Sequence, residues 1–306
     1  MGDLSKKVNM ELIRKSIIPL NNQEWLNIRG TKITGTQTRI AMEWFCGCQQ
    51  LKDEARDCEK EEYKPSKFGF IFEKLLSKEE KEEYLKLDKQ VNHYKYEAFE
   101  FGKEKEQQLG EVGFNMLKTK FPELYENATL KPNNDEFFYL ENHYIGATPD
   151  FIIEQENGDK TILECKTCSY KSYNDFLVKK YSFQVMSQMI CSGIQKAFII
   201  FGLKDFNNKN IVKYEIQEIG FYENVVPYFI KACDDCYEWF LKYKKERDEA
   251  IKQGYTDEAI YDLLKIKPTT KQDELILKAI KNVKTFKAFQ LMFSEKKEKT
   301  KNKLSW

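Results

Sequence analysis

Two carboxylates and a lysine near the middle of the chain have types and spacing that could perform phosphodiester chemistry. Asp150 precedes one apolar run, and Glu164 and Lys166 end the next as Glu-Cys-Lys. Because side chains alternate across a strand, Glu164 and Lys166 point to one face and Cys165 points to the other. Asp150, at the open end of the partner strand, can converge on them. Two carboxylates beside an ammonium group predict a site for a hard divalent cation and an activated water.

The elements that must position these side chains are two strands joined by a tight turn. The apolar runs 151–153 and 161–163 predict the strands, and Asn157-Gly158 between them predicts a hairpin, because such a turn needs residues that tolerate positive φ. The alternative is a solvated charged face, which is common beside hairpins. The metal site is favoured because the Glu-x-Lys group ends an apolar strand instead of alternating along an exposed one.

Pro-Asp followed by a spacer and Glu-x-Lys resembles the signature of the PD-(D/E)XK nuclease superfamily. The resemblance implies that Asp150, Glu164 and the backbone carbonyl of Cys165 hold Mg²⁺, with Mn²⁺ as a substitute. It also implies that Lys166 orients or activates the attacking water. The implied fold is an α/β restriction-endonuclease-like core, in which helices flank a central mixed β-sheet, with a helical C-terminal extension.

An upstream segment narrows the resemblance. Residues 25–36, Trp-Leu-Asn-Ile-Arg-Gly-Thr-Lys-Ile-Thr-Gly-Thr, resemble the Trp…Arg…Ile-Thr-Ala-Ser segment of lambda exonuclease and the YqaJ-like viral recombinases. The resemblance implies that Arg29 takes the phosphate of a 5′ end, with Thr34 and Thr36 as hydroxyl donors. A guanidinium group can grip a phosphate in a bidentate way that lysine cannot. The alternative is a helix start capped by a threonine.

Residues 98–106 resemble the aromatic-Gly-x-x-x-Glu helix of the same family, whose glutamate joins the metal site. Gly102 and Glu106 are four residues apart and share a helical face, where the glycine lets the helix lie close to the sheet. Glu106 is therefore predicted as a catalytic residue and metal ligand. Glu104 is the competing candidate, and an exposed helix of mixed charge is the alternative for either.

Downstream of the Glu-x-Lys group, the chain carries two glutamines one helical turn apart. By resemblance Gln184 is catalytic and orders water or phosphate near the metal, and Gln188 is a phosphate contact. In the family's commoner form the second glutamine follows two residues after the first, where this chain has Met186. Lys179 and Lys180 provide local positive charge for DNA.

The composition predicts a folded protein with a local, not a global, basic surface. The chain has 306 residues, 41% of them hydrophobic, and a formal net charge of +1, which by itself does not indicate a nucleic-acid binder. We expect an exonuclease domain over 1–254 and a helical extension with a basic tail over 255–306.

Histidine and cysteine usage excludes several kinds of site. Two histidines exclude most histidine-rich metal centres and make a Ser-His-Asp hydrolase implausible. Eight cysteines without a signal peptide favour reduced structural thiols over disulfides. A zinc ion or iron–sulfur cluster joining Cys46 or Cys48 to Cys233 and Cys236 stays open as the disfavoured alternative.

Hydrophobic periodicity predicts the order of elements. Strands are expected near 136–140, 144–146, 151–155, 160–166, 197–203 and 211–219, with the glutamine helix after the fourth. Helices are expected over 1–24, most of 37–92, 95–120, 222–252, 256–264 and 270–292. No apolar run is long enough to cross a membrane, and the protein is expected in the cytoplasm of a bacterium or of a phage- or virus-infected cell.

The resemblance implies an Mg²⁺-dependent exonuclease that digests linear double-stranded DNA, running 5′ to 3′. The product strands would serve an annealing protein in phage recombination, and the enzyme would be a homotrimer. Two other classes stay open. One is a structure- or sequence-specific endonuclease on the same core, of the restriction or repair type. The other is a non-catalytic DNA-binding relative.

Overall fold

The structure, a computed structural model, describes residues 13–17, 23–57, 66, 69–70, 74–133, 136–205, 210–255 and 270–301. The chain divides into two compact units, residues 1–61 with 98–239 and residues 62–97 with 240–306. Two of the three boundaries fall inside long helices, α6 (His93–Lys120) and α9 (Val226–Lys252). The domain boundary expected at residue 254 lies inside the second unit.

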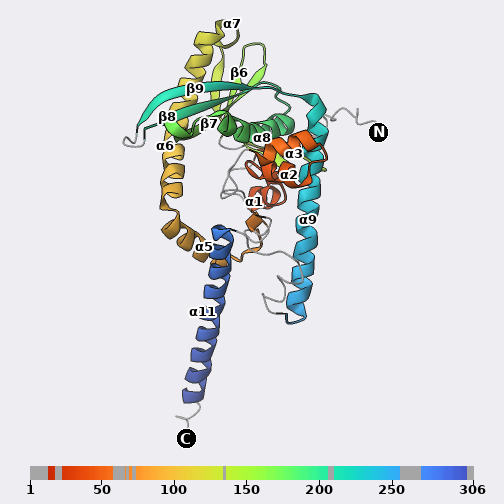
Figure 1. Ribbon diagram of the computed structural model, residues 1–306, viewed down its shortest axis with the longest axis vertical. Helices are drawn as coiled ribbons and strands as arrows, with labels where there is room; N and C mark the ends of the chain where they lie inside the picture. The colour runs from red at the N-terminus through yellow and green to blue at the C-terminus, as the bar shows by residue number, and fades with distance from the viewer. Residues whose placement is uncertain are drawn as a thin grey trace. The chain divides into compact units, whose positions relative to one another are not determined.

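The first unit contains a five-stranded mixed sheet in the order β3-β6-β7-β8-β9 (Figure 1). Strands β6 and β7 form the expected antiparallel hairpin, whose turn holds Gly158 at a positive φ of 86°. Strands β7 and β8 are parallel and are connected through helix α8, as a parallel pair requires a crossover. The bounds are β3 Thr129–Pro132, β6 Phe151–Glu154, β7 Lys160–Ser169, α8 Asp175–Ser192, β8 Ala197–Lys204 and β9 Ile211–Ile219.

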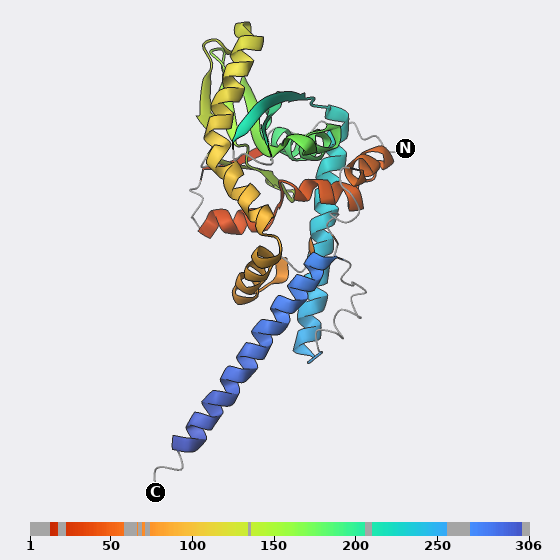
Figure 2. The ribbon, with the colours of Figure 1, turned by 60° about the vertical axis from the view of Figure 1, so that its left-hand side comes forward.

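Helix α6 packs along one face of this sheet (Figure 2). Leu109 and Leu117 of the helix join a buried cluster with Leu163, Cys165 and other residues of that face. The approach is close: a Cβ atom on Gly110 would lie 2.5 Å from the ring of Phe151. Because neighbouring residues point to opposite faces, Glu164 and Lys166 of β7 lie on the other side, which α8 covers.

A second sheet in the first unit has the order β1-β4-β5-β2. Its strands are β1 Ile13–Ile17, β2 Ile33–Thr34, β4 Glu136–Leu140 and β5 Ile145–Ala147. The expected helix over 1–24 is wrong at Ile13–Ile17, which pairs antiparallel with the aromatic strand β4. A long-range pairing of this kind overrides the local pattern of a short segment. Residues 1–12 and 18–22 lie outside the described residues.

The helices of the first unit surround these sheets. Helix α9 is tied to the second sheet by Asp234, which accepts a hydrogen bond from the Tyr144 amide at 2.8 Å and lies 2.7 Å from Nδ1 of His143. The remaining helices are α1 Gln23–Gly30, α2 Gln37–Phe45, α3 Gln49–Arg56 and α7 Pro122–Tyr125. A mixed sheet flanked by helices is the α/β architecture expected from the sequence, and that expectation is confirmed.

The second unit pairs helix α5 (Lys78–Val91) with helix α11 (Lys271–Lys301). Ile276 and Ala279 of α11 are fully buried, and Gln272 donates a hydrogen bond to the Tyr84 hydroxyl of α5 at 2.7 Å. The C-terminal part is thus helical, as expected. The helix expected over 256–264 lies outside the described residues.

Candidate active site

Glu164 is the centre of the site. It lies in β7, is fully buried, and receives hydrogen bonds on both carboxylate oxygens. Oε1 accepts from the ammonium group of Lys166 and from Nε2 of Gln184 at 2.5 Å, and Oε2 accepts from Nε2 of Gln188 at 2.7 Å. A buried carboxylate is stable only with such partners, so the alternative of a solvated face does not describe Glu164.

Asp150 lies beside Glu164, at the start of the partner strand. Its Oδ2 accepts a hydrogen bond at 2.8 Å from the backbone amide of Cys165, the residue that follows Glu164. The hairpin therefore holds the two carboxylate-bearing residues next to each other. Burial, and then the negative charge of Glu164, raise the pKa of Asp150 well above its usual range; Lys166 and the Cys165 amide oppose this shift. The two acids therefore repel each other when both are ionised.

Lys166 is the counter-ion of this pair. Burial alone would lower its pKa, but the charges of Glu164 and Asp150 outweigh burial and raise the pKa above its usual value. The ammonium group also lies 5.2 Å from the centroid of the Tyr181 ring, on α8. Lys166 is therefore a positively charged hydrogen-bond donor at neutral pH.

Of the two acids of α6 considered from the sequence, Glu106 has a pKa that the charge of Glu164 affects. Burial, followed by the charge of Glu164, raises the pKa of Glu106, and Lys166 opposes the shift. Glu104 is exposed and lies 3.0 Å from Lys105. Gly102 has the predicted packing position, because a Cβ atom there would lie 3.2 Å from the Thr167 hydroxyl of β7.

The segment that contains Arg29, Thr34 and Thr36 is connected to the site by strand pairing in the second sheet. Arg29 is in the last turn of α1, and Thr34 in β2 pairs with Gly146 of β5, two residues before Thr148. Thr36 occupies the N-cap position of α2 but its side chain makes no capping hydrogen bond. The structure thus connects the segment to the strand that leads into Asp150.

The lysines predicted to contact DNA lie in the first half of α8. Lys179 and Lys180 are half-buried, and Lys180 lies 6.0 Å from the ring centroid of Tyr181. Helix α8 therefore carries these lysines one turn before Gln184, whose amide contacts Glu164. Gln188, by contrast, is 1% exposed.

The donor set fits a hard divalent cation. Asp150 and Glu164 offer carboxylate oxygens. Their negative charges and that of Glu106 repel one another, and a bound divalent cation would neutralise this charge. Within the described residues, no three His, Cys, Asp or Glu side chains converge closely enough to form a complete metal cage. Asp150 and Glu164 are thus the two carboxylates that this arrangement offers to a cation, and the charge of Glu164 also acts on Glu106 as a third acid.

Comparison with known proteins identifies the family. The family model of the YqaJ-like viral recombinase domain matches residues 24–195, which is more than half of the chain. The chain belongs to the YqaJ-like viral recombinase family. The matched range contains every residue of the site described above. No curated protein matches the chain.

Three solved structures are similar to this YqaJ-like chain at low identity. The alkaline exonuclease LHK-Exo from Laribacter hongkongensis has 13% identity and a TM-score of 0.39, and covers 76% of this chain and 97% of its own. Its complex with dAMP has 14% identity and a TM-score of 0.43, with 76% and 100% covered. A phage-related exonuclease from Haemophilus somnus 129PT has 11% identity and a TM-score of 0.41, with 68% and 95% covered. The family membership and the site together support a nuclease role.

Two buried polar residues of the YqaJ-like domain were not anticipated from the sequence. Lys32 is 7% exposed and donates hydrogen bonds to the carbonyls of Leu140 and His143, at 3.1 and 2.5 Å. Asn133 is 8% exposed and contacts the backbone of Pro149 and Asp150. Lys32 lies within the segment 25–36, but its bonds to carbonyls more than 100 residues away could not be read from that pattern, and Asn133 stands in no motif identified from the sequence.

Three of the four cysteines considered for a metal cluster are buried. Cys233 and Cys236 are fully buried in α9, and Cys46 is buried at the end of α2. Burial raises the pKa of the Cys233 thiol well above its usual value. Burial of this kind is typical of structural thiols.

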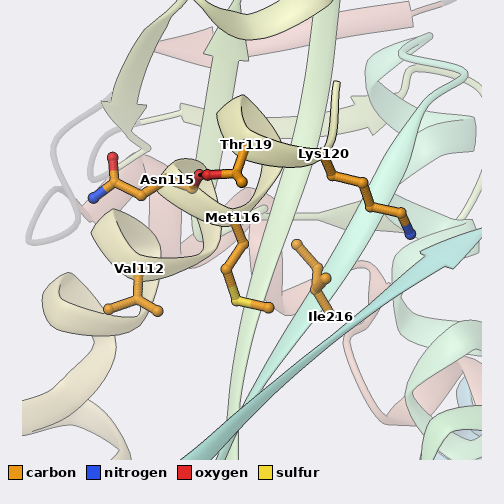
Figure 3. A pocket seen from close by; sticks show the side chains of 6 residues that line it. All are labelled: Val112, Asn115, Met116, Thr119, Lys120 and Ile216. Atoms are coloured by element: carbon orange, nitrogen blue, oxygen red, sulfur yellow. Dashed lines mark hydrogen bonds between the residues drawn. The ribbon is translucent and has the colours of Figure 1, made fainter. Parts of the chain in front are cut away.

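A pocket of about 460 Å³ lies away from the carboxylates, between α6 and β9 (Figure 3). Met116 projects from the helix toward Ile216 of the edge strand, and Val112 also lines the pocket. Its lining has no carboxylate, so this pocket offers nothing for metal chemistry.

In the described residues, no helix is both long and apolar enough to cross a membrane.

Proposed function

We propose that the chain is an Mg²⁺-dependent exonuclease that digests linear double-stranded DNA from 5′ ends. The observation that carries the proposal is Glu164: a fully buried carboxylate with three side-chain donors, beside a second acid that it repels. Electrostatic repulsion between two buried acids is typical of a cation-binding site rather than of a structural ion pair. Membership of the YqaJ-like family supports the same activity.

Asp150, Glu164 and the Cys165 carbonyl would hold the cation, with Glu106 as a further ligand. A bound Mg²⁺ would supply Lewis-acid stabilisation of the charge that develops on the scissile phosphate, and Mn²⁺ would substitute for it. Gln184 orients Glu164 through its 2.5 Å hydrogen bond. These ligands are hard oxygen donors, which Mg²⁺ prefers.

Lys166 acts as a donor in this mechanism. In the metal-free protein the charges of Glu164 and Asp150 raise its pKa, so it carries a proton at neutral pH and donates a hydrogen bond to Glu164. Its ammonium group can hold a water oxygen in line with the phosphate and stabilise negative charge as that charge grows. We infer that Lys166 orients or activates the attacking water.

The DNA contacts surround this centre. Arg29 would grip the terminal phosphate, with the Thr34 and Thr36 hydroxyls as further donors. Lys179 and Lys180 would attract the backbone of the strand as it approaches α8. The enzyme would work as a homotrimer in the cytoplasm and would deliver single strands to an annealing protein for recombination.

Digestion of a linear duplex labelled at the 5′ or the 3′ end, in Mg²⁺ or in EDTA, tests the proposal. We expect early loss of the 5′ label in Mg²⁺ and no cleavage in EDTA. Early loss of the 3′ label would contradict the polarity, and cleavage in EDTA would contradict the metal. A closed circular plasmid should stay intact; its cleavage would favour an endonuclease instead.

A further inference from the structure

Asp150 and the two residues before it are held by hydrogen bonds to their backbone carbonyls. The carbonyl of Thr148 accepts from Nε2 of Gln188 at 3.2 Å, that of Pro149 accepts from Nδ2 of Asn133 at 3.1 Å, and that of Asp150 accepts from the Asn133 amide at 2.9 Å. Each donor belongs to a residue less than 10% exposed. Consecutive carbonyls bonded in this way fix the direction in which the Asp150 side chain leaves the backbone.

Gln188 also reaches the second carboxylate. The Nε2 group that bonds to Thr148 donates to Oε2 of Glu164 at 2.7 Å, so one amide connects both acid-bearing segments. The orientation of this amide is determined, because a carboxylate only accepts and would repel the amide oxygen. The oxygen Oε1 of Gln188 is buried and has no hydrogen-bond partner among the described residues.

An orphaned buried oxygen is informative about what the residue does. Leaving such a group unpaired costs about 1–3 kcal/mol, so packing alone would favour an apolar side chain of the same length. The amide is instead placed where its nitrogen serves Glu164 and Thr148. A phosphate contact would need an exposed amide, whereas 1% of Gln188 is exposed.

We propose that Asn133 and Gln188 are positioning residues that set the distance and orientation of Asp150 and Glu164 for a shared divalent cation. Gln188 therefore acts on the carboxylates and not on DNA. The inference rests on the metal site of the proposed function, but it does not depend on which nucleic acid is cut. Outer partners of metal ligands typically change metal affinity or activity by about 10–100-fold.

Gln188→Met and Asn133→Ala test the inference. Gln188→Met keeps the length of the side chain and removes the bridging amide. Asn133→Ala removes the side-chain bonds to the carbonyls of Pro149 and Glu136 and leaves the backbone amide in place. Thr161→Val is the matched control, because Thr161 is fully buried in the same strand as Glu164 and its hydroxyl bonds to Tyr125 at 3.2 Å, away from the acids.

The first readout is Mn²⁺ or Mg²⁺ binding by calorimetry in the absence of DNA, and the second is kcat and KM on linear duplex. We expect both variants to bind metal about 10–100-fold more weakly and to lose kcat, with KM for DNA ends unchanged. Thr161→Val should lose stability in urea without losing metal affinity. If one variant does not fold, the other carries the test.

Metal affinity equal to wild type in a folded variant, or a raised KM with normal kcat, would overturn the inference. A wild-type protein that binds metal but cuts no DNA would remove the proposed function, and weakened binding in the variants would still support the positioning role. A wild-type protein that binds no metal would contradict both.

Discussion

Replacing Lys166 with methionine should destabilise the metal-free protein, because it removes the counter-ion of a buried acid cluster. The Glu164 side chain is 0% exposed and that of Lys166 is 18% exposed, so their ion pair is largely shielded from water. Breaking a buried pair by removing one partner typically costs about 3–5 kcal/mol. Uptake of a proton by Asp150, whose pKa is already raised, relieves part of the repulsion. We therefore expect a loss near the lower end, about 3 kcal/mol.

A divalent cation should restore much of this stability. In the wild type, Lys166 bonds to Oε1 of Glu164, so the ammonium group and a cation would compete for the same carboxylate. Removal of the lysine ends that competition and leaves the acids uncompensated. A ligand at about 100 times its Kd stabilises a protein by about 2.7 kcal/mol, and the variant should gain more than the wild type.

Urea unfolding in EDTA and in Mg²⁺ measures both effects. Lys171→Met is the matched control, because Lys171 is exposed shortly after the end of the same strand, and it should change stability by about 0.5 kcal/mol or less. The reasoning is refuted if Lys166→Met is as stable as the wild type in EDTA. It is also refuted if Mg²⁺ stabilises both proteins equally.

Three further outcomes are expected. Glu106→Gln should lower the rate of DNA cleavage at least about tenfold, and Glu104→Gln should not, since removing a metal partner commonly costs that much; equal rates in a nuclease assay would exclude Glu106. Burial would raise the pKa of Asp88, but hydrogen bonds from neighbouring side chains and a nearby lysine outweigh it and lower that pKa. The carboxylate therefore stabilises the protein above the unfolded pKa of about 4, and the stability difference between wild type and Asp88→Asn should vanish as acid lowers the pH through the folded pKa; a difference that persists in acid unfolding curves would contradict this. Gly110→Ala should cost about 1–3 kcal/mol in thermal unfolding, whereas Gly47→Ala, with open space around the glycine, should cost little.

The sequence predicted those features of the fold and the site that depend on patterns of neighbouring residues. Alternation along 160–166 predicted which side of β7 holds Glu164 and Lys166, and the Asn-Gly turn predicted the hairpin that brings Asp150 beside them. Strand periodicity also located β8 and β9. Such features depend on neighbours a few residues apart, which a single sequence displays directly.

The rest depends on partners far along the chain. Ile13–Ile17 has no strand-like alternation of apolar and polar residues. It forms β1 because it pairs antiparallel with β4. Asn133 holds the Pro149 carbonyl across 16 residues, and Lys32 holds the Leu140 carbonyl across 108. No spacing rule connects such pairs. The resemblance likewise suggested a phosphate role for Gln188, while the folded chain places its amide on Glu164.

The most direct test of the central claim compares wild type with Glu164→Gln on a linear duplex. The variant keeps the shape of the side chain and removes the negative charge that the cation needs. The account predicts release of mononucleotides by the wild type in Mg²⁺, none in EDTA, and none by a folded Glu164→Gln variant in either condition. Nucleotide release by that variant at the wild-type rate would contradict the account.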